Sequence, residues 1–140
     1  MTKHNVMKLT VEFGDCDPAQ IVFYPNFFRW FDAGTRNFFA ACGVARWQDM
    51  RESHGIIGTP LVDASAKFLG IVTYGDSIEV QSWVEEWKRS SFVMAHRISK
   101  DGEVVVEGRE VRVFAGPDPA DLKRIRAVPI PEDVRRLCTQ

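Results

Sequence analysis

The segment from Phe13 to Cys42 constrains the fold of this chain more than any other part of the sequence. Its second half repeats apolar or small residues at spacings of three and four, the period of one helical face. These residues are Phe27, Trp30, Phe31, Gly34, Phe38 and Ala41, and Phe28 and Phe39 widen the face. Pro25 suits a first helical turn and Gly43 suits a helix stop. The sequence therefore predicts a long, largely buried helix over residues 25–42, wrapped by a sheet.

Strand patterns precede and follow this helix. A first strand is predicted over residues 7–13, and further strands over residues 61–74, 78–88, 91–99 and 103–114. Asp101-Gly102 is a strong hairpin signal between the last two strands. A short second helix is predicted over residues 46–53, a loop over 116–119 and a terminal helical turn over 131–138.

The order of these elements is strand, long helix and four successive strands, which predicts an α+β fold. Consecutive hairpins favour an antiparallel sheet wrapped around one long central helix. One face of the sheet must cover the helix, and one face of the strand over residues 78–88 carries Ile78, Val80, Ser82 and Val84. We expect the other face to carry Trp83 and Trp87 and to form an oligomer interface.

Length and charge narrow the class of protein. A chain of 140 residues predicts one domain, residues 1–140, with a core that needs no metal or disulfide staple. Lys and Arg total 18 and Asp and Glu total 19, a balance that suggests neither nucleic acid nor an anionic membrane as partner. The N-terminus MTKHNVMKLT has no apolar signal core, so a cytoplasmic protein with free thiols at its three cysteines is expected.

Two carboxylates, Asp15 and Asp17, stand in the loop before the helix. Aspartate is common in loops because its side chain makes local turns, so both could be structural. Alternatively, one could be catalytic, since the free N–H groups of a helix start can hold an oxyanion beside it. An Asp-x-Asp pair can also bind a cation, but no further carboxylate stands nearby to complete an oxygen cage. The residues alone leave the structural and the catalytic reading open.

Other nucleophiles and bases have weaker support. Cys16 lies between the two aspartates, whose like charge disfavours its thiolate. His96 is a lone strand histidine, which is more often a core or surface residue than a catalyst. The chain contains no Gly-x-Ser-x-Gly motif, P-loop or dinucleotide fingerprint. These observations exclude the commonest hydrolase and nucleotide-binding signatures.

A basic pair, Lys88-Arg89, lies at a predicted strand end. It could be a solvated strand end, or it could be an edge that binds phosphate, since Lys and Arg supply point-charge and bidentate contacts. Arg124 and Arg126 could add to such an edge.

The stretch GDCDPAQIVFYPNFFRWFDAGTRNFF, residues 14–39, resembles the 4-hydroxybenzoyl-CoA thioesterase family of hot-dog-fold acyl-CoA hydrolases. Further matches are GIIGTPLV at 55–62, EWKRSSFV at 86–93 and RIRAVPIPED at 124–133. The resemblance covers essentially the whole chain. It implies a hot-dog fold, homodimers with a continuous sheet that assemble into homotetramers, and an active site at the dimer interface. It implies no metal and no cofactor, because CoA is part of the substrate.

The resemblance also implies roles for particular residues. Asp17 would be the catalytic carboxylate, and the backbone N–H of Tyr24 would polarise the thioester carbonyl. The aromatic acyl group would be surrounded by Asp32, Trp47 and Thr59. The CoA phosphates and nucleotide would be met by Lys88, Arg89 and Arg126. We therefore expect a thioesterase for an aromatic, 4-hydroxybenzoyl-like acyl-CoA. The alternatives are a thioesterase for another short-chain or aryl acyl-CoA, or a non-catalytic acyl-CoA-binding protein.

Three positions depart from the family pattern. Gln20 stands in the loop where relatives usually have glycine, Phe28 replaces a more polar residue, and Ser90 replaces a third basic residue after Lys88-Arg89. We expect the chemistry to be kept and the acyl specificity and CoA contact to be altered.

Overall fold

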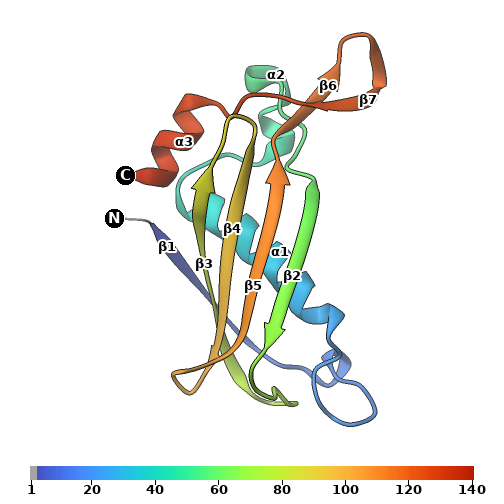
Figure 1. Cartoon of the computed structure of the whole chain (residues 1–140), viewed down its shortest axis with the longest axis vertical. Helices are drawn as coiled ribbons and strands as arrows, with labels where there is room; N and C mark the ends of the chain where they lie inside the picture. The colour runs from blue at the N-terminus through green and yellow to red at the C-terminus, as the bar shows by residue number, and fades with distance from the viewer. Residues whose placement is uncertain (1–2) are drawn as a thin grey trace.

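The computed structural model describes residues 3–140 and places one long helix, α1 (Pro25–Ala41), across one face of a five-stranded antiparallel sheet (Figure 1). The strands are β1 (His4–Thr10), β2 (Leu61–Phe68), β3 (Ser77–Trp87), β4 (Ser91–Lys100) and β5 (Glu103–Val113), in the spatial order β1-β3-β4-β5-β2. The α+β class and the antiparallel sheet around one long helix are confirmed.

Smaller elements gather beyond one end of the sheet (Figure 1). They are 3₁₀ turn Trp47–Asp49, α2 (Arg51–His54), the hairpin of β6 (Ala115–Asp118) and β7 (Asp121–Ala127), and α3 (Glu132–Thr139). A second 3₁₀ turn, Phe13–Asp15, lies in the loop before α1. The first strand, β1, lies earlier in the chain than the predicted range 7–13. The predicted loop 116–119 belongs to the β6–β7 hairpin.

The long helix matches its prediction closely. It begins at Pro25 and ends at Ala41, and Gly43 follows with φ 87°, the left-handed conformation that glycine adopts without strain. Its buried residues are Phe27, Trp30, Phe31, Gly34, Thr35, Phe38 and Phe39. Ala41, which the pattern placed on the buried face, is exposed.

The prediction that consecutive hairpins join the four strands after the helix is wrong for β2. This strand pairs with β5 at the edge of the sheet, and not with β3, which follows it in the chain. The connecting residues 69–76 cross the end of the sheet: Leu69 N–H donates to Val105 O, Val22 N–H to Val72 O and Gly75 N–H to Val11 O. Gly75-Asp76 therefore ends a crossover and does not close a hairpin.

The prediction that Trp83 and Trp87 share the outer face of the sheet is also wrong. A β-bulge between Val84 and Glu86 shifts the alternation of β3 by one residue. Trp87 therefore turns to the core side, where its ring lies 5.7 Å from that of Phe92. Trp83 stays on the outer face, stacked on His4 with a ring-centroid distance of 4.5 Å.

The interior divides into two apolar clusters along α1. The first packs under the start of the helix and includes Phe27, Trp30, Phe31, Val72, Ile78, Val80, Ile98 and Val106. The second packs under its end and includes Phe38, Phe39, Met50, Ile56, Phe92, Met94, Phe114 and Val134. Besides these clusters, six polar side chains are buried among the described residues, and side-chain hydrogen bonds join five of them: Thr35, Ser82, His96, Glu110 and Arg112. A buried polar layer therefore separates the two halves of the core.

Gly108 on β5 lets the helix approach the sheet closely. A Cβ atom there would lie less than 3.0 Å from three ring carbons of Phe31, which is fully buried. We expect Gly108→Ala to lower the free energy of unfolding by about 1–3 kcal/mol through overpacking. Chemical denaturation of this variant checks the effect. Gly14→Ala is the matched control and should be nearly neutral, because no atom lies within 4 Å of its added Cβ.

Candidate active site

A small hairpin-like loop holds Asp17 beside the start of α1. Two backbone hydrogen bonds close the loop: Asp17 N–H donates to Ile21 O at 2.9 Å, and Phe23 N–H donates to Asp15 O at 2.9 Å. Gln20 N–H closes a turn onto Asp17 O at 2.8 Å. One carboxylate oxygen of Asp17, Oδ1, accepts a hydrogen bond from Ala19 N–H at 2.8 Å. No hydrogen bond from another described residue reaches its Oδ2, which leaves that oxygen free for a substrate.

Asp15, in contrast, is tied into the protein. Its carboxylate accepts hydrogen bonds from Glu12 N–H at 2.9 Å and from Arg29 Nη2 at 2.8 Å. Its backbone carbonyl also accepts from Asn26 Nδ2 at 2.8 Å. These contacts join the loop to the first turns of α1, so the two aspartates that look alike in the sequence have different surroundings.

Gln20 has a backbone conformation that explains why glycine suits its position. Its φ is 66°, in the left-handed region that residues other than glycine adopt at a cost in free energy. The loop nevertheless closes with its hydrogen bond to Asp17 O intact. Gln20 therefore adds an exposed side chain to the loop while the turn is kept.

The Tyr24 N–H is an unused donor at the start of the helix. Tyr24 precedes Pro25, which has no N–H, and the next two donors, Asn26 and Phe27, bond to Phe23 O and Tyr24 O. Among residues 3–140, no acceptor takes a hydrogen bond from Tyr24 N–H. This donor lies at the positive end of a 17-residue helix, where negative charge is stabilised.

An apolar hollow of about 360 Å³ opens beside this loop. Ile21, Tyr24, Phe27, Phe68 and Ile71 are among its lining residues. Hollows of about 430 and 530 Å³ also occur, on the outer face of the sheet and beside β1 and β3, but polar and charged side chains line much of both and neither includes the loop. The hollow beside Tyr24 therefore has the apolar character that an aromatic or pantetheine group needs.

The three residues predicted to surround the acyl group do not lie at this loop. Trp47 packs on Phe39 and Phe114 at the far end of α1, with ring centroids 5.2 and 5.4 Å away. Thr59 is buried just before β2. Asp32 lies midway along α1 with its side chain half exposed.

The three basic residues predicted to bind CoA are exposed beyond the same far end. Lys88 and Arg89 form the β3–β4 turn, where Lys88 N–H donates to Ser91 O and Ile130 N–H donates to Arg89 O, each at 2.8 Å. Arg126 lies on β7, opposite Gly116 of β6. None of the three forms an ion pair with a carboxylate among the described residues, so their charge is available to an anion.

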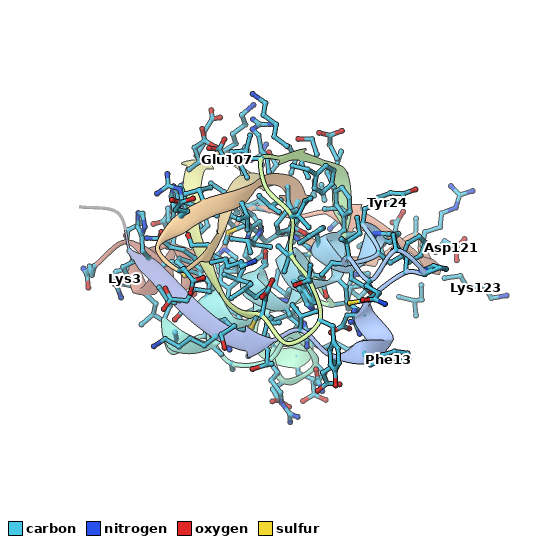
Figure 2. All side chains as sticks on the ribbon, turned by 90° about the horizontal axis from the view of Figure 1, so that it is seen from below. Lys3, Phe13, Tyr24, Glu107, Asp121 and Lys123 are labelled. Atoms are coloured by element: carbon cyan, nitrogen blue, oxygen red, sulfur yellow. The ribbon has the colours of Figure 1, made fainter. Side chains whose placement is uncertain are left out.

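The residues predicted to form the site therefore fall into two groups in one chain, which we call the two half-sites. The Asp17–Tyr24 loop lies at the start of α1, whereas Trp47, Lys88, Arg89 and Arg126 lie beyond its end; a helix of 17 residues is about 25 Å long. Figure 2, viewed from below, shows Tyr24 on the same side of the molecule as Asp121 and Lys123 of the β6–β7 hairpin. In Figure 1 that hairpin and the loop before α1 lie at opposite ends of this side.

The cysteines are not arranged for nucleophilic chemistry. Cys16, Cys42 and Cys138 are free thiols, as predicted. Burial, followed by the charges of neighbouring aspartates, raises the pKa of the Cys16 thiol. The prediction that like charge disfavours its thiolate is confirmed in direction. Among residues 3–140 no cluster of His, Cys, Asp and Glu could hold a metal ion.

A buried arginine connects two of the predicted acyl residues, and sequence reasoning missed it. Arg112 donates from Nη1 to Thr59 O at 2.9 Å and from Nη2 to Asp32 Oδ1 at 2.8 Å. The same Nη2 donates to Glu110 Oε2 at 2.7 Å. Asp32 and Thr59 are therefore held by one guanidinium group.

Glu110 continues this network into the polar layer of the core. Its Oε1 accepts from Thr35 Oγ1 at 2.5 Å and lies 2.8 Å from His96 Nε2. The other ring nitrogen of His96 lies 2.7 Å from Ser82 Oγ. The interpretation of His96 as a satisfied core residue agrees with this position. Hydrogen bonds between neighbours lower the cost of burying these polar groups, although Arg112 Nε is buried without a partner among residues 3–140.

The sequence contained a signal for this network. Residues on one strand face alternate, so Glu110 and Arg112 share the face of β5 that Val106 and Phe114 turn to the core. Two charged residues at consecutive core-facing positions require partners, and a reading of that face would have identified them as a buried pair.

Glu110 is held ionised by its partners. Burial by itself raises the pKa of its carboxyl group. Hydrogen bonds from His96 and Arg112 lower this pKa by more than burial raises it, so the pKa falls to about 2. Burial lowers the pKa of Arg112, and Glu110 and Asp32 raise it more, so the guanidinium stays charged. The network therefore presents a fixed cation to Asp32.

The depressed pKa of Glu110 predicts a loss of stability in acid. A folded-state pKa below the unfolded value of 4.5 stabilises the fold above pH 4.5, and this contribution, about 3 kcal/mol, disappears as the pH falls toward 2. Denaturation at a series of pH values should show a flatter profile in this window for Glu110→Gln. Glu107→Gln is the control: this exposed residue of the same strand lies on the outer face (Figure 2), and its profile should follow the wild type.

The fold and the carboxylate loop together define a hot-dog-fold thioesterase. The chain belongs to the thioesterase-like superfamily, whose pattern matches residues 11–137. It is 40% identical over 144 residues to the 4-hydroxybenzoyl-CoA thioesterase of Pseudomonas sp. strain CBS-3, an alignment that covers 99% of this chain and 100% of the relative.

Solved structures agree with this assignment. A mutant 4-hydroxybenzoyl-CoA thioesterase in complex with 4-hydroxybenzoyl-CoA superimposes with a TM-score of 0.91 at 39% identity, over 97% of this chain and 99% of the other. The gentisyl-coenzyme A thioesterase BH1999 superimposes with a TM-score of 0.81 at 31% identity, over 96% of this chain and 100% of the other. No helix among residues 3–140 is both long and apolar enough to cross a membrane.

Proposed function

We propose that this protein hydrolyses an aromatic, 4-hydroxybenzoyl-like acyl-CoA to the free acid and CoA. The observation that carries the proposal is that the loop before α1 contains both the Asp17 carboxylate, with a free oxygen, and the unused Tyr24 N–H at the helix start. The similar 4-hydroxybenzoyl-CoA and gentisyl-CoA thioesterases act on hydroxylated aryl-CoA thioesters, which supports the same substrate class.

The chemistry needs one carboxylate and one oxyanion donor. As a nucleophile, Asp17 attacks the thioester carbonyl carbon, the C–S bond breaks, CoA leaves as a thiolate, and water hydrolyses the resulting mixed anhydride. As a general base, Asp17 takes a proton from water, which attacks the carbonyl carbon directly. In both routes the oxyanion forms at Tyr24 N–H. We favour the nucleophile, following the family resemblance, and a thiolate leaving group requires no strong general acid.

We further propose that a complete site needs two copies of the chain. The edge strand β2 exposes Leu61, Val62 and Phe68 and has a free backbone edge beyond β5. Antiparallel pairing of two such edges would continue the sheet. It would also place the α1 start of one copy near the α1 end of the other, which would bring the two half-sites together.

Several wider expectations belong to this proposal. The dimers would assemble into a homotetramer, and the whole chain, residues 1–140, would act as one domain in the cytoplasm with acyl-CoA as its partner. Three free cysteines suit a reducing compartment. The reaction as written uses no cofactor, because CoA enters as part of the substrate.

Replacing Lys88 and Arg89 together with Ala should raise KM more than it lowers kcat. Their exposed, unpaired charges would bind CoA phosphates equally in the ground and transition states, and loss of such uniform binding appears in KM. The wild-type KM should also rise with salt, because exposed charges are screened. Steady-state kinetics at two ionic strengths measure both effects, and an unchanged KM in the double variant would make this turn a plain solvated strand end.

The rival function is binding of acyl-CoA without turnover. Titration calorimetry and thiol release, measured on the same panel of aryl and short-chain acyl-CoA thioesters, separate the two. Turnover of an aryl thioester supports the enzyme. Tight binding of every thioester with no thiol release would support the binding protein and overturn the proposal.

A further inference from the structure

Asp32 and Thr59, the residues proposed to meet the acyl group, are hydrogen-bonded to a charged side chain buried inside the protein. Arg112 is 8% exposed and Glu110 is 2% exposed, yet both are ionised, and both lie between the two apolar clusters under α1. The network extends from Ser82 through His96 and Glu110 to Arg112, and ends at Asp32, whose side chain is 50% exposed. It therefore connects the centre of the core to a carboxylate that solvent or a ligand can reach.

The shape of the guanidinium group makes this arrangement specific. Arg112 uses two nitrogens for three acceptors: the Thr59 carbonyl, Asp32 Oδ1 and Glu110 Oε2, at 2.7 to 2.9 Å. A planar guanidinium holds acceptors in fixed directions, whereas a lysine ammonium is a single point charge on a flexible stem. Glu110 is itself held by hydrogen bonds with Thr35 and His96, so Arg112 has an anchored partner inside the core.

We infer that Arg112, fixed from within by Glu110 and His96, is a positioning residue that sets Asp32 as an anionic hydrogen-bond acceptor beside the Thr59 carbonyl and so selects acyl rings bearing a hydroxyl group. The inference rests on the proposed function because it places Asp32 and Thr59 at the acyl group. Asp32 Oδ1 is used by Arg112, while Arg36, which is exposed, is the one partner of Oδ2 among residues 3–140, at 3.5 Å. Oδ2 is thus the acceptor offered to a ligand hydroxyl.

A purely structural role for the network would not affect ring selection. A polar layer that only fixes the fold would change stability when altered, and ligands with and without the hydroxyl would lose affinity together. A positioning role predicts that the affinity ratio between the two ligands changes, because only the hydroxylated ring uses Asp32.

The test is a comparison of two thioether analogues that no thioesterase can hydrolyse, 4-hydroxyphenacyl-CoA and phenacyl-CoA. Titration calorimetry of the wild type should show the hydroxylated analogue binding about 10- to 100-fold more tightly, the range for a hydrogen bond to a charged group. Arg112→Lys keeps the positive charge but lacks the planar guanidinium group, so the affinity ratio of the two analogues should fall to about twofold. Asp32→Asn should lower the ratio similarly, and the double variant should lower it no further.

Arg109→Lys is the matched control, since Arg109 lies on the same strand with a half-exposed side chain and faces outward. Its ratio should equal that of the wild type. If Arg112→Lys does not fold, Glu110→Gln removes the inner anchor with little change of shape, and its ratio should also fall. A wild-type ratio near one, or an unchanged ratio in a folded Arg112→Lys or Glu110→Gln protein, would overturn the inference. Absence of turnover with the wild-type ratio intact would instead refute only the proposed hydrolysis.

Discussion

Asp17→Asn should lower kcat by about 10²–10⁴-fold while leaving substrate binding nearly unchanged, and by more if a covalent step is lost. The amide has the shape of the carboxylate and keeps an oxygen that can accept the Ala19 N–H, so the loop should stay closed. It cannot attack a thioester or take a proton from water. Single-turnover kinetics with an aryl-CoA thioester measure the effect.

Asp15→Asn is the matched control in the same loop. Asp15 is bonded to Glu12 N–H and Arg29, so its replacement should lower stability and change kcat far less than Asp17→Asn does. Near wild-type turnover in Asp17→Asn would remove Asp17 from the mechanism in either role.

Heavy-oxygen labelling distinguishes the two roles of Asp17. One turnover in ¹⁸O water leaves label in the Asp17 peptide if water hydrolyses a mixed anhydride at the enzyme carbonyl. General-base catalysis places all of the label in the released acid.

The second large effect is expected from mixing two defective variants. Asp17→Asn chains and Lys88→Ala/Arg89→Ala chains should each be nearly inactive at substrate concentrations well below KM. If the two half-sites meet across a dimer, a mixed dimer contains one intact site, formed by the good halves of both chains. Dissociation and reassociation of an equal mixture should then restore about one quarter of the wild-type activity, because half of the dimers are mixed and each has one good site of two.

A triple variant provides the control for this mixing experiment. A chain carrying Asp17→Asn, Lys88→Ala and Arg89→Ala should inactivate a wild-type partner, because each site of the mixed dimer then contains one damaged half. If the site were contained in one chain, the first mixture would gain nothing and the wild-type partner would keep its own site. A monomeric mass in light scattering at micromolar concentration would also contradict a shared site.

The sequence predicted the parts of the fold that depend on local patterns. The apolar repeat with Pro25 and Gly43 located α1 to within one residue, and Asp101-Gly102 marked the β4–β5 hairpin, where both residues have positive φ. Side-chain spacing and turn chemistry set these elements, and both can be read from neighbouring residues.

Long-range pairing and one bulge could not be read in this way. The placement of β2 beside β5 depends on residues 69–76 crossing to Val11 and Val22, contacts between segments far apart in the chain. The β3 bulge moved Trp87 to the core by inserting one residue that no composition pattern marks. The division of the site into two halves depends on the same three-dimensional arrangement.

The candidate site was predicted unevenly for a similar reason. Asp17 and Tyr24 lie within one loop, so a motif captured both. Arg112 reaches Thr59 and Asp32 from a distant strand, and only its core-facing position on β5 gave a hint of it.

The most direct test of the central claim is the ratio of kcat/KM for 4-hydroxybenzoyl-CoA to that for acetyl-CoA, measured by thiol release with the wild-type protein. An aromatic thioesterase should reach at least about 10⁴ M⁻¹s⁻¹ with the aryl thioester, the lower end for enzymes on their own substrates, and should use acetyl-CoA at least about 100-fold less well. Equal, slow release from both thioesters, or none from either, would contradict the account.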